Sequence, residues 1–173
     1  MESDNFMTTP PQYCSACGSK LTRKKIDGRI RDICTACKKI AYRNPIPVAA
    51  ALVVDKQDRL LLVKRKIEPK RGMWCLPMGF AEINETIQES ALRELKEEAG
   101  IDGRVISLLD LLSSKSELYG DMLVVTFHIE HTAGVTQAGD DAEEAKWFPL
   151  SALPPLAFSS NQKALTAYLK QRN

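Results

Sequence analysis

The sequence predicts an α/β domain preceded by a small zinc ribbon. Two observations predict this fold class. Two Cys-x-x-Cys pairs lie close to the N-terminus, and apolar runs typical of strands surround one well-capped helix and precede a second helix. A chain of 173 residues with 44% hydrophobic content is long enough for one ordinary domain and a small module. We expect a loose tail at residues 1–12, the ribbon at 13–44 and the α/β domain at 45–173.

Charge is distributed unevenly along the chain. The net charge is only +2, but residues 1–45 carry nine Lys and Arg residues and four acidic residues, while the remainder is acidic overall. The chain as a whole is therefore not expected to bind a polyanion. No apolar run is long enough to span a bilayer and no signal-peptide core is visible, so we expect no membrane partner and a cytoplasmic location.

Four cysteines near the N-terminus are spaced as zinc ligands. They form two knuckles with sixteen residues between them, and each knuckle can offer two thiolates to one tetrahedral ion: Cys14, Cys17, Cys34 and Cys37. Disulfides need an oxidising compartment, which nothing in the sequence indicates, and a redox Cys-x-x-Cys motif would not need a second copy. We expect a structural Zn²⁺ here, with a hairpin turn at Asp27-Gly28 between the knuckles.

The role of the ribbon has two interpretations. Zinc ribbons often bind nucleic acid or protein, and this one is basic. A modest excess of lysine is more often solvated surface, however, and no aromatic residues alternate with the cations to stack on bases. We therefore expect a structural lobe that packs on the following domain or supports a homodimer, and nucleic acid is not an expected partner.

The α/β domain begins with two apolar segments. Residues 48–54 form a nearly continuous apolar run, which is typical of a strand covered on both faces. A second strand, residues 60–65, ends in three cations centred on Arg65. These cations are candidates to meet phosphate, although cations at strand ends more often face solvent. Cys75, in the loop that follows, is expected to be a small buried hydrophobic residue rather than a nucleophile.

A capped helix with an acidic stripe organises the domain. Thr86 and Glu89 form a capping box at its start, and Gly100 suits the left-handed residue that ends a helix. Apolar residues recur at helical spacing on one side, and three acidic residues gather on an adjacent side: Glu94, Glu97 and Glu98.

This acidic stripe opposes helix stability. Like charges three or four residues apart repel by roughly a few tenths of a kcal/mol per pair, and acid near a helix C-terminus opposes the helix dipole. The stripe is explained if a hard cation such as Mg²⁺ or Mn²⁺ binds there, since these ions prefer oxygen ligands. The alternative is a solvated acidic face, which is the commonest fate of a charge run.

The full spacing of this stretch is more specific than its charge. Nine specified positions match the Nudix box, so the chain resembles the Nudix hydrolase family through the pattern Gly79-x5-Glu85-x7-Arg93-Glu94-Leu95-x-Glu97-Glu98-x-Gly100-Ile101. The resemblance implies an α/β/α sandwich with a mixed sheet. It also implies an enzyme in which Mg²⁺ or Mn²⁺ ions bridge a diphosphate while water attacks a phosphorus of a nucleoside diphosphate linked to another moiety.

The resemblance also implies a role for each box residue. The expected ligands of the catalytic cations are three helix carboxylates, one later acid and one backbone carbonyl: Glu94, Glu97, Glu98, Glu144 and Gly79. The proton of the attacking water is expected to go to Glu98, Glu97 or Glu144, and these alternatives stay open. Arg93 is expected to orient a helix glutamate through a bidentate pair, and Glu85 is expected to support the loop or the outer metal shell.

Further strands are expected after the box. We place them at residues 105–112 and 122–130, and a short strand at 145–148 follows a glycine-containing loop at 133–141. Glu144 lies just before the short strand, and its spacing to Trp147-Phe148 selects it as the additional metal ligand; the alternative is an exposed loop acid. The chain ends in a structural helix with one apolar face.

Three further segments are similar to zinc-ribbon Nudix proteins linked to FAD and ADP-ribose hydrolysis: CTACKKIAYRNP, GMWCLPMGF and LPPLAFSS. NADH pyrophosphatases of the family carry an SQPWPFP-type array after the box, which this chain lacks after Ile101. The similarity implies FAD or ADP-ribose as the substrate, with AMP and a second monophosphate as products. Candidate substrate contacts are one cation and three aromatic side chains: Arg65, Phe80, Tyr119 and Phe158.

Other functions stay open. One is a pyrophosphatase acting on NADH or on nucleoside triphosphates, the latter with release of pyrophosphate. The other is a non-catalytic ligand-sensing module whose ribbon binds nucleic acid. Such modules tend to have lost box carboxylates, and this box is complete.

Overall fold

A computed structural model describes residues 10–172 of the chain. The described residues form two compact units, which are treated separately: residues 10–45 together with 116–121, and residues 46–115 together with 122–172. Residues 1–9 of the predicted tail lie outside the described residues. The backbone N–H of Leu21 donates to the Gln12 carbonyl oxygen at 2.9 Å, next to the predicted boundary between tail and ribbon.

The first unit contains a three-stranded antiparallel sheet in the order β1-β2-β3. Its strands are β1 (Leu21–Ile26), β2 (Arg29–Cys34) and β3 (Ile40–Ala41). The predicted hairpin turn is confirmed, because Asp27 and Gly28 join β1 to β2 with φ values of 49° and 77°. Positive φ at both central residues is the mark of a tight hairpin whose twist matches its strands.

The second unit is built on two sheets with different strand directions. The four-stranded sheet has the order β7-β4-β9-β8, made of β7 (Met78–Phe80), β4 (Ile46–Leu52), β9 (Gly120–Gly134) and β8 (Ile101–Ser116). Here β4 pairs antiparallel with β7 and parallel with β9, so the sheet is mixed as expected. The other sheet has the order β10-β5-β6, made of β10 (Ala142–Pro149), β5 (Arg59–Arg65) and β6 (Trp74–Cys75).

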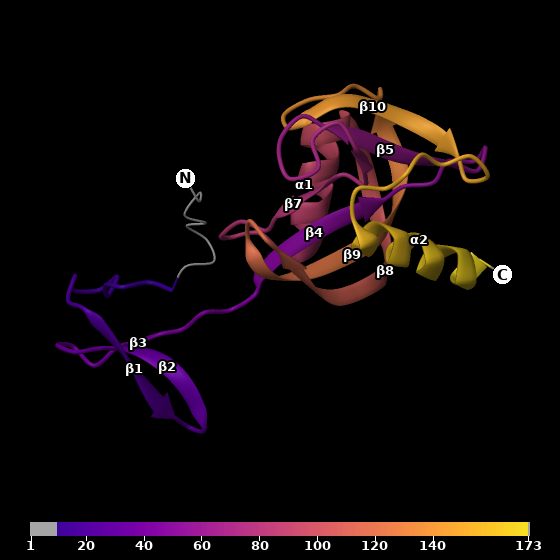
Figure 1. The fold of residues 1–173 in the computed structure, drawn as a ribbon. Coiled ribbons are helices and arrows are strands. Elements are labelled where there is room, and N and C mark those ends of the chain that lie inside the picture. The colour runs from indigo at the N-terminus through magenta and orange to yellow at the C-terminus, as the bar shows by residue number, and fades with distance from the viewer. Residues whose placement is uncertain (1–9, 173) are drawn as a thin grey trace. The chain divides into compact units, whose positions relative to one another are not determined.

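Two helices cover opposite faces of the strands, α1 (Ile87–Ala99) and α2 (Ser159–Arg172) (Figure 1). Side chains alternate along a strand, and the core divides accordingly. Ala49 and Ala51 of β4 pack in one buried cluster with Leu95 of α1, whereas Leu52 packs in a second cluster with Ala164 of α2. The α/β/α sandwich is therefore confirmed. Among the described residues, no helix is long and apolar enough to cross a membrane.

The β8–β9 hairpin and β10 are longer than predicted. Strand pairing continues to Ser116 and resumes at Gly120, where a loop over residues 113–121 was expected. Polar residues in this stretch hide the strand from an apolar pattern, although the backbone pairs all the same. β10 begins at Ala142, so Glu144 lies inside a strand rather than before one, and the pairing of β10 with β5 is irregular between these two residues.

Candidate active site

Helix α1 holds the acidic stripe between two well-formed ends. Thr86 and Glu89 make the predicted capping box, and Gly100 ends the helix in the left-handed conformation with φ 73°. Glu94 and Glu98 are only 8% and 5% exposed, which rules out a fully solvated acidic face for them. Buried carboxylates need polar partners, and the surrounding elements supply these.

Arg93 is the centre of the charge network. Its guanidinium makes a bidentate pair with Glu85, with Nε to Oε2 at 3.0 Å and Nη2 to Oε1 at 2.8 Å. Nη1 makes single bonds to Glu94 at 2.7 Å and Glu97 at 2.9 Å, and Nη2 donates to the Phe80 carbonyl at 3.0 Å. The bidentate partner is thus the loop glutamate and not a helix glutamate, which corrects the sequence expectation.

Glu85 fastens the loop in front of α1. Its Oε1 accepts a hydrogen bond from the Glu82 backbone N–H at 2.7 Å, in addition to the Arg93 pair. The Arg93 hydrogen bonds hold the pKa of Glu85 down to about 2. Its carboxylate therefore serves loop support, one of the two roles expected for it.

Glu98 is a buried carboxylate hydrogen-bonded to strand β7. Its Oε2 accepts a hydrogen bond from the Met78 backbone N–H at 2.9 Å. Burial raises the pKa of Glu98 to about 8, the Met78 bond and Arg65 oppose this shift, and Glu94 adds to it. Burial likewise raises the pKa of Glu94, against the effect of Arg93.

Gly79 provides the space in which the Glu94 carboxylate lies. A Cβ at position 79 would stand 2.2 Å from Oε1 of Glu94, a distance at which the glutamate must move. Gly79 pairs with Ala49 in the sheet, so its backbone has little freedom to retreat. A glycine is needed here for close approach rather than for an unusual backbone angle.

The loop after β9 closes on the C-terminal end of α1. The N–H groups of Gln137 and Gly139 donate to the carbonyls of Ala99 and Glu98 at 3.0 and 3.3 Å. A Cβ on Gly139 would meet the Glu97 carbonyl oxygen at 2.5 Å, so glycine permits this close contact. The loop satisfies helix carbonyls that have no partner within the helix.

This loop brings in two acids that sequence reasoning missed. The charge of Asp140 contributes to raising the pKa of Glu94, and the charge of Asp141 contributes to raising that of Glu98. Both carboxylates therefore lie near the α1 stripe. The available signal was Gly139 immediately before the pair, inside the glycine-containing loop already noted.

Glu144 lies in a different setting. Lys64 of β5 donates to its Oε1 at 2.9 Å, and Lys146 donates to its Oε2. The hydrogen bonds from Lys146 and Lys64 lower the pKa of Glu144 to about 2. Cross-strand lysines, rather than the α1 glutamates, are the partners of this carboxylate, so its role as a metal ligand stays a prediction with weaker support than before.

Arg65 and Phe158, two of the predicted substrate contacts, lie together. The Arg65 guanidinium is 5.2 Å from the centre of the Phe158 ring, and its Nε donates to the Pro69 carbonyl at 2.7 Å. The charge of Arg65 also acts on Glu98. Cys75 beside them is buried, as expected, and burial raises the pKa of its thiol to about 12.

The other two aromatic candidates occupy different positions. Phe80 is in β7, and its backbone carbonyl serves Arg93. Tyr119 lies in the turn between β8 and β9, in the compact unit that contains the ribbon. Their roles as substrate contacts stay predictions.

The four ribbon cysteines meet the geometry of a zinc site. Their sulfurs all lie within 4.8 Å of one another, with 3.7 Å between Cys14 and Cys37 and 3.5 Å between Cys17 and Cys34. Sulfurs bound about 2.3 Å from a tetrahedral Zn²⁺ are about 3.8 Å apart. The cysteines are free thiols rather than disulfides, so the donor set fits structural zinc.

The donors on α1 fit hard divalent cations. Carboxylate oxygens are the ligands that Mg²⁺ and Mn²⁺ prefer. The absence of a side chain at Gly79 lets the Glu94 carboxylate lie directly against the strand backbone. Among the described residues, only the cysteines converge within 4.8 Å as a group of three or more metal-ligating side chains. The α1 carboxylates are instead distributed around Arg93 and the Met78 amide.

Two family models match adjacent parts of this chain and together cover residues 12–169. The NUDIX domain matches residues 44–169, and the Nudix N-terminal zinc ribbon matches residues 12–43. The chain therefore belongs to the Nudix hydrolase family, and it is an enzyme of the zinc-ribbon group within it.

This chain is similar to two kinds of curated relative. An ADP-ribose pyrophosphatase of Methanocaldococcus jannaschii is 39% identical over 133 residues, which cover 76% of this chain and 78% of the relative. An NAD-capped RNA hydrolase NudC of Pseudomonas aeruginosa is 27% identical over 84% of this chain. The chain spans about half the length of that relative, since the match covers 50% of it.

Solved structures agree on the fold. A NUDIX hydrolase from Nitrosomonas europaea superposes with a TM-score of 0.83 at 29% identity, covering 94% of this chain and 92% of the other. The NUDIX domain of Shewanella oneidensis NrtR, solved with ADP ribose, gives a TM-score of 0.67 at 23% identity over 76% of this chain and 91% of its own. The second likeness concerns the fold alone.

Proposed function

We propose that this enzyme hydrolyses the diphosphate bond of a nucleoside diphosphate linked to another moiety. ADP-ribose is the preferred candidate for the substrate, and FAD is the next candidate. The products are AMP and a second monophosphate. The observation that carries the proposal is the complete carboxylate stripe of α1, held by Arg93 and given space by Gly79. The ADP-ribose pyrophosphatase of M. jannaschii, similar over most of both chains, supports ADP-ribose as the first choice.

The reaction needs one bond made and one broken. A water oxygen attacks one phosphorus, the bridging P–O bond breaks, and the water proton passes to a carboxylate. The chemistry that bound Mg²⁺ or Mn²⁺ supplies is neutralisation of the diphosphate charge and a lower pKa for water. Glu94, Glu97 and Glu98 would hold these ions, and the proton acceptor is proposed among Glu97, Glu98 and the acids of the 140–141 loop.

Arg93 and the loop acids have supporting roles. Arg93 offsets the repulsion between Glu94 and Glu97 and restrains their rotamers, because one guanidinium nitrogen bonds both carboxylates. Asp140 and Asp141 add negative charge beside the stripe, as an additional cation ligand must. We therefore propose Asp141 ahead of Glu144 as the ligand from outside the box.

Substrate recognition is proposed for Arg65 and Phe158. The guanidinium acts electrostatically on Glu98, so it lies within range of a diphosphate bound at the stripe. Phe158 packs on that guanidinium and is only partly buried, which leaves it able to contact an adenine or flavin ring. Arg65→Lys would keep the charge but lose the planar stacking, and a higher KM with kcat little changed is expected.

A product-resolved substrate panel tests the proposal. Purified protein is incubated with Mg²⁺ or Mn²⁺ and ADP-ribose, FAD, NADH, diadenosine polyphosphates or nucleoside triphosphates, and products are separated by chromatography. AMP from ADP-ribose or FAD is expected. AMP from NADH alone would move the enzyme to the NADH class, and pyrophosphate from a triphosphate would identify a triphosphate pyrophosphatase. No turnover would favour a ligand-sensing module.

Matched variants connect the activity to the site. Glu97→Gln and Glu98→Gln are expected to lower kcat by at least about 100-fold, the usual contribution of a positioned acid–base group, while the protein stays folded. Glu130→Gln is the control, because this exposed glutamate pairs with Arg104 away from the stripe. Wild-type turnover in both helix variants would contradict the assignment.

A further inference from the structure

The two faces of the ribbon sheet differ in charge. Cross-strand partners in a sheet share a face, and β1 pairs with β2 so that Lys24 lies opposite Arg31 and Ile26 opposite Arg29. Tyr42, which directly follows β3, packs on Arg31. We name this surface the Lys24 face and define it by Lys24, Arg29, Arg31 and Tyr42.

The cations of the Lys24 face repel one another. Like charges directly opposite on neighbouring strands destabilise a sheet. Among the described residues, no ion pair offsets Lys24, Arg29 or Arg31, whereas Arg23 on the other face pairs with Asp32 at 3.7 Å. The repulsion between Lys24 and Arg31 destabilises the ribbon alone, and an anion bound between the two cations would offset this repulsion.

An exposed aromatic ring lies beside these cations. Tyr42 is 63% exposed, and the Arg31 guanidinium stands 5.2 Å from its ring centre. The sequence hides this pairing, because Tyr42 follows Arg31 by eleven residues and reaches it only across the sheet. The expectation that nucleic acid is no partner assumed that the cations lack aromatic neighbours, and the structure removes that premise.

We propose that the Lys24 face binds a single-stranded polynucleotide. Such ligands bind where a cationic surface tracks the phosphates and an exposed aromatic ring stacks on a base. Lys24, Arg29 and Arg31 supply the first feature, and Tyr42 supplies the second. An acidic peptide would use the cations and leave the ring without a role.

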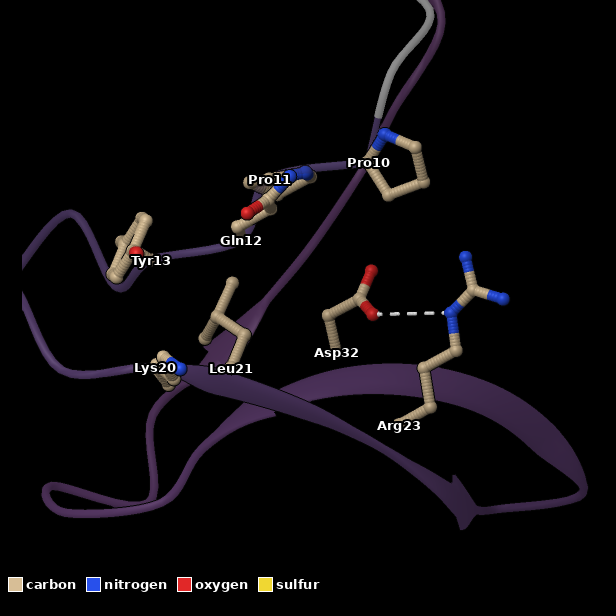
Figure 2. A pocket seen from close by; sticks show the side chains of 8 residues that line it. All are labelled: Pro10, Pro11, Gln12, Tyr13, Lys20, Leu21, Arg23 and Asp32. Carbon is tan, nitrogen blue, oxygen red and sulfur yellow. Dashed lines mark ion pairs between the residues drawn. The ribbon is translucent and has the colours of Figure 1, made fainter.

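The other face of the same sheet provides an internal control. Residues 10–13 lie over it and line a pocket of about 440 Å³ with residues that include Leu21 and the Arg23–Asp32 pair (Figure 2). Lys25 projects on this side, because side chains alternate along β1 and Lys25 directly follows Lys24. A Lys25 variant therefore removes the same charge from the same strand without touching the proposed surface.

Binding is measured by fluorescence anisotropy with the full chain, zinc-loaded and free of other divalent ions. The probes are RNA and DNA single strands of about 12 nucleotides with one sequence, and the corresponding DNA duplex. We expect single strands of either sugar to bind better than the duplex. The logarithm of the binding constant should fall linearly with the logarithm of the salt concentration between about 50 and about 200 mM. Absence of binding, or preference for the duplex, would overturn the proposal.

Point variants locate the surface. Lys24→Ala and Arg31→Ala should each reduce the salt slope by about 0.7, one phosphate contact of a single strand. Tyr42→Leu should weaken binding roughly tenfold with the slope unchanged, and Tyr13→Leu, another exposed ribbon tyrosine, should not. If Lys25→Ala weakens binding as much as Lys24→Ala does, the attraction is general charge and the proposal fails.

Two readouts keep these results separate from folding and catalysis. Zinc content verifies that each variant ribbon is folded, because four thiolates must converge to bind the ion. Hydrolysis of ADP-ribose is measured on the same preparations and is expected to be unchanged, since none of these side chains belongs to the α1 site. Loss of nucleic-acid binding with hydrolysis retained supports the proposal, and it does so independently of which nucleotide the enzyme prefers.

Discussion

The ribbon cysteines and the α1 carboxylates are both predicted metal ligands, but the chain brings the two groups together in opposite ways. Each cysteine pair is separated by two residues, and one hairpin between the knuckles brings the four sulfurs within 4.8 Å. The α1 carboxylates are spread around groups from other elements, namely Arg93, the Met78 amide and the 137–141 loop. A structural zinc site is filled by four protein ligands, whereas a catalytic metal site keeps a position open for water or substrate.

The largest effect is expected from breaking the zinc centre alone. Cys34→Ser should abolish zinc binding and unfold the ribbon, because structural zinc contributes about 10–16 kcal/mol in small zinc-binding peptides. The second compact unit has its own core, so ADP-ribose hydrolysis should persist. Zinc analysis, limited proteolysis and the activity assay check this. Cys75→Ser is the control, because it leaves the four ribbon cysteines in place. Loss of hydrolysis by soluble Cys34→Ser protein would show that the activity of the second unit depends on the zinc ribbon.

The next effect comes from filling the space beside Glu94. Gly79→Ala should lower activity roughly 10- to 100-fold and cost about 1–3 kcal/mol of stability, as expected for overpacking, because the added Cβ would stand 2.2 Å from the carboxylate. Gly72→Ala is the matched control. Its Cβ meets no atom within 4 Å, although its φ of +79° is strained, so it should lose stability and keep activity. Equal activity losses in both variants would point to backbone strain instead.

A smaller effect distinguishes the two acids proposed from outside the box. Asp141→Asn should raise the Mg²⁺ or Mn²⁺ concentration needed for half-maximal activity roughly tenfold, the usual scale for groups that tune a metal site. Glu144→Gln should change it less than about twofold, because lysines hold that carboxylate. Titrations of activity with each metal distinguish the two variants. A larger effect of Glu144→Gln than of Asp141→Asn would favour Glu144 as the metal ligand from outside the box.

The last effect is a pH dependence of stability caused by Glu98, with no change in the architecture of the site. Its pKa is about 8 in the folded chain, above the ordinary 4.5, so its protonated form is the one that folding favours. Its stabilising contribution is complete below about pH 4.5 and is lost as the pH rises through about 8. Without divalent ions, wild type should lose melting temperature between pH 5 and pH 8 relative to Glu98→Gln. If the melting temperatures of wild type and Glu98→Gln change in parallel with pH, the raised pKa of Glu98 is contradicted.

Local patterns of the sequence were sufficient to predict that the four cysteines, and likewise the α1 carboxylates, lie close together. Cys-x-x-Cys spacing and helical spacing are converted into positions by the backbone itself, so Cys14 and Cys17, or Glu94 and Glu98, are neighbours wherever the rest of the chain lies. The same holds for the caps of α1 and for the turn at Asp27-Gly28. These features need no knowledge of tertiary contacts.

Only the tertiary structure decided which residues from distant parts of the sequence contact these functional side chains. Asp141 lies some forty residues beyond Glu98, Phe158 lies far from Arg65, and Tyr42 reaches Arg31 only across a sheet. Such contacts depend on strand register and on the path of a loop, which no local pattern encodes. Sequence spacing therefore determined which cysteines and carboxylates lie together in this protein. Long-range packing determined which other residues alter their charge and their contacts.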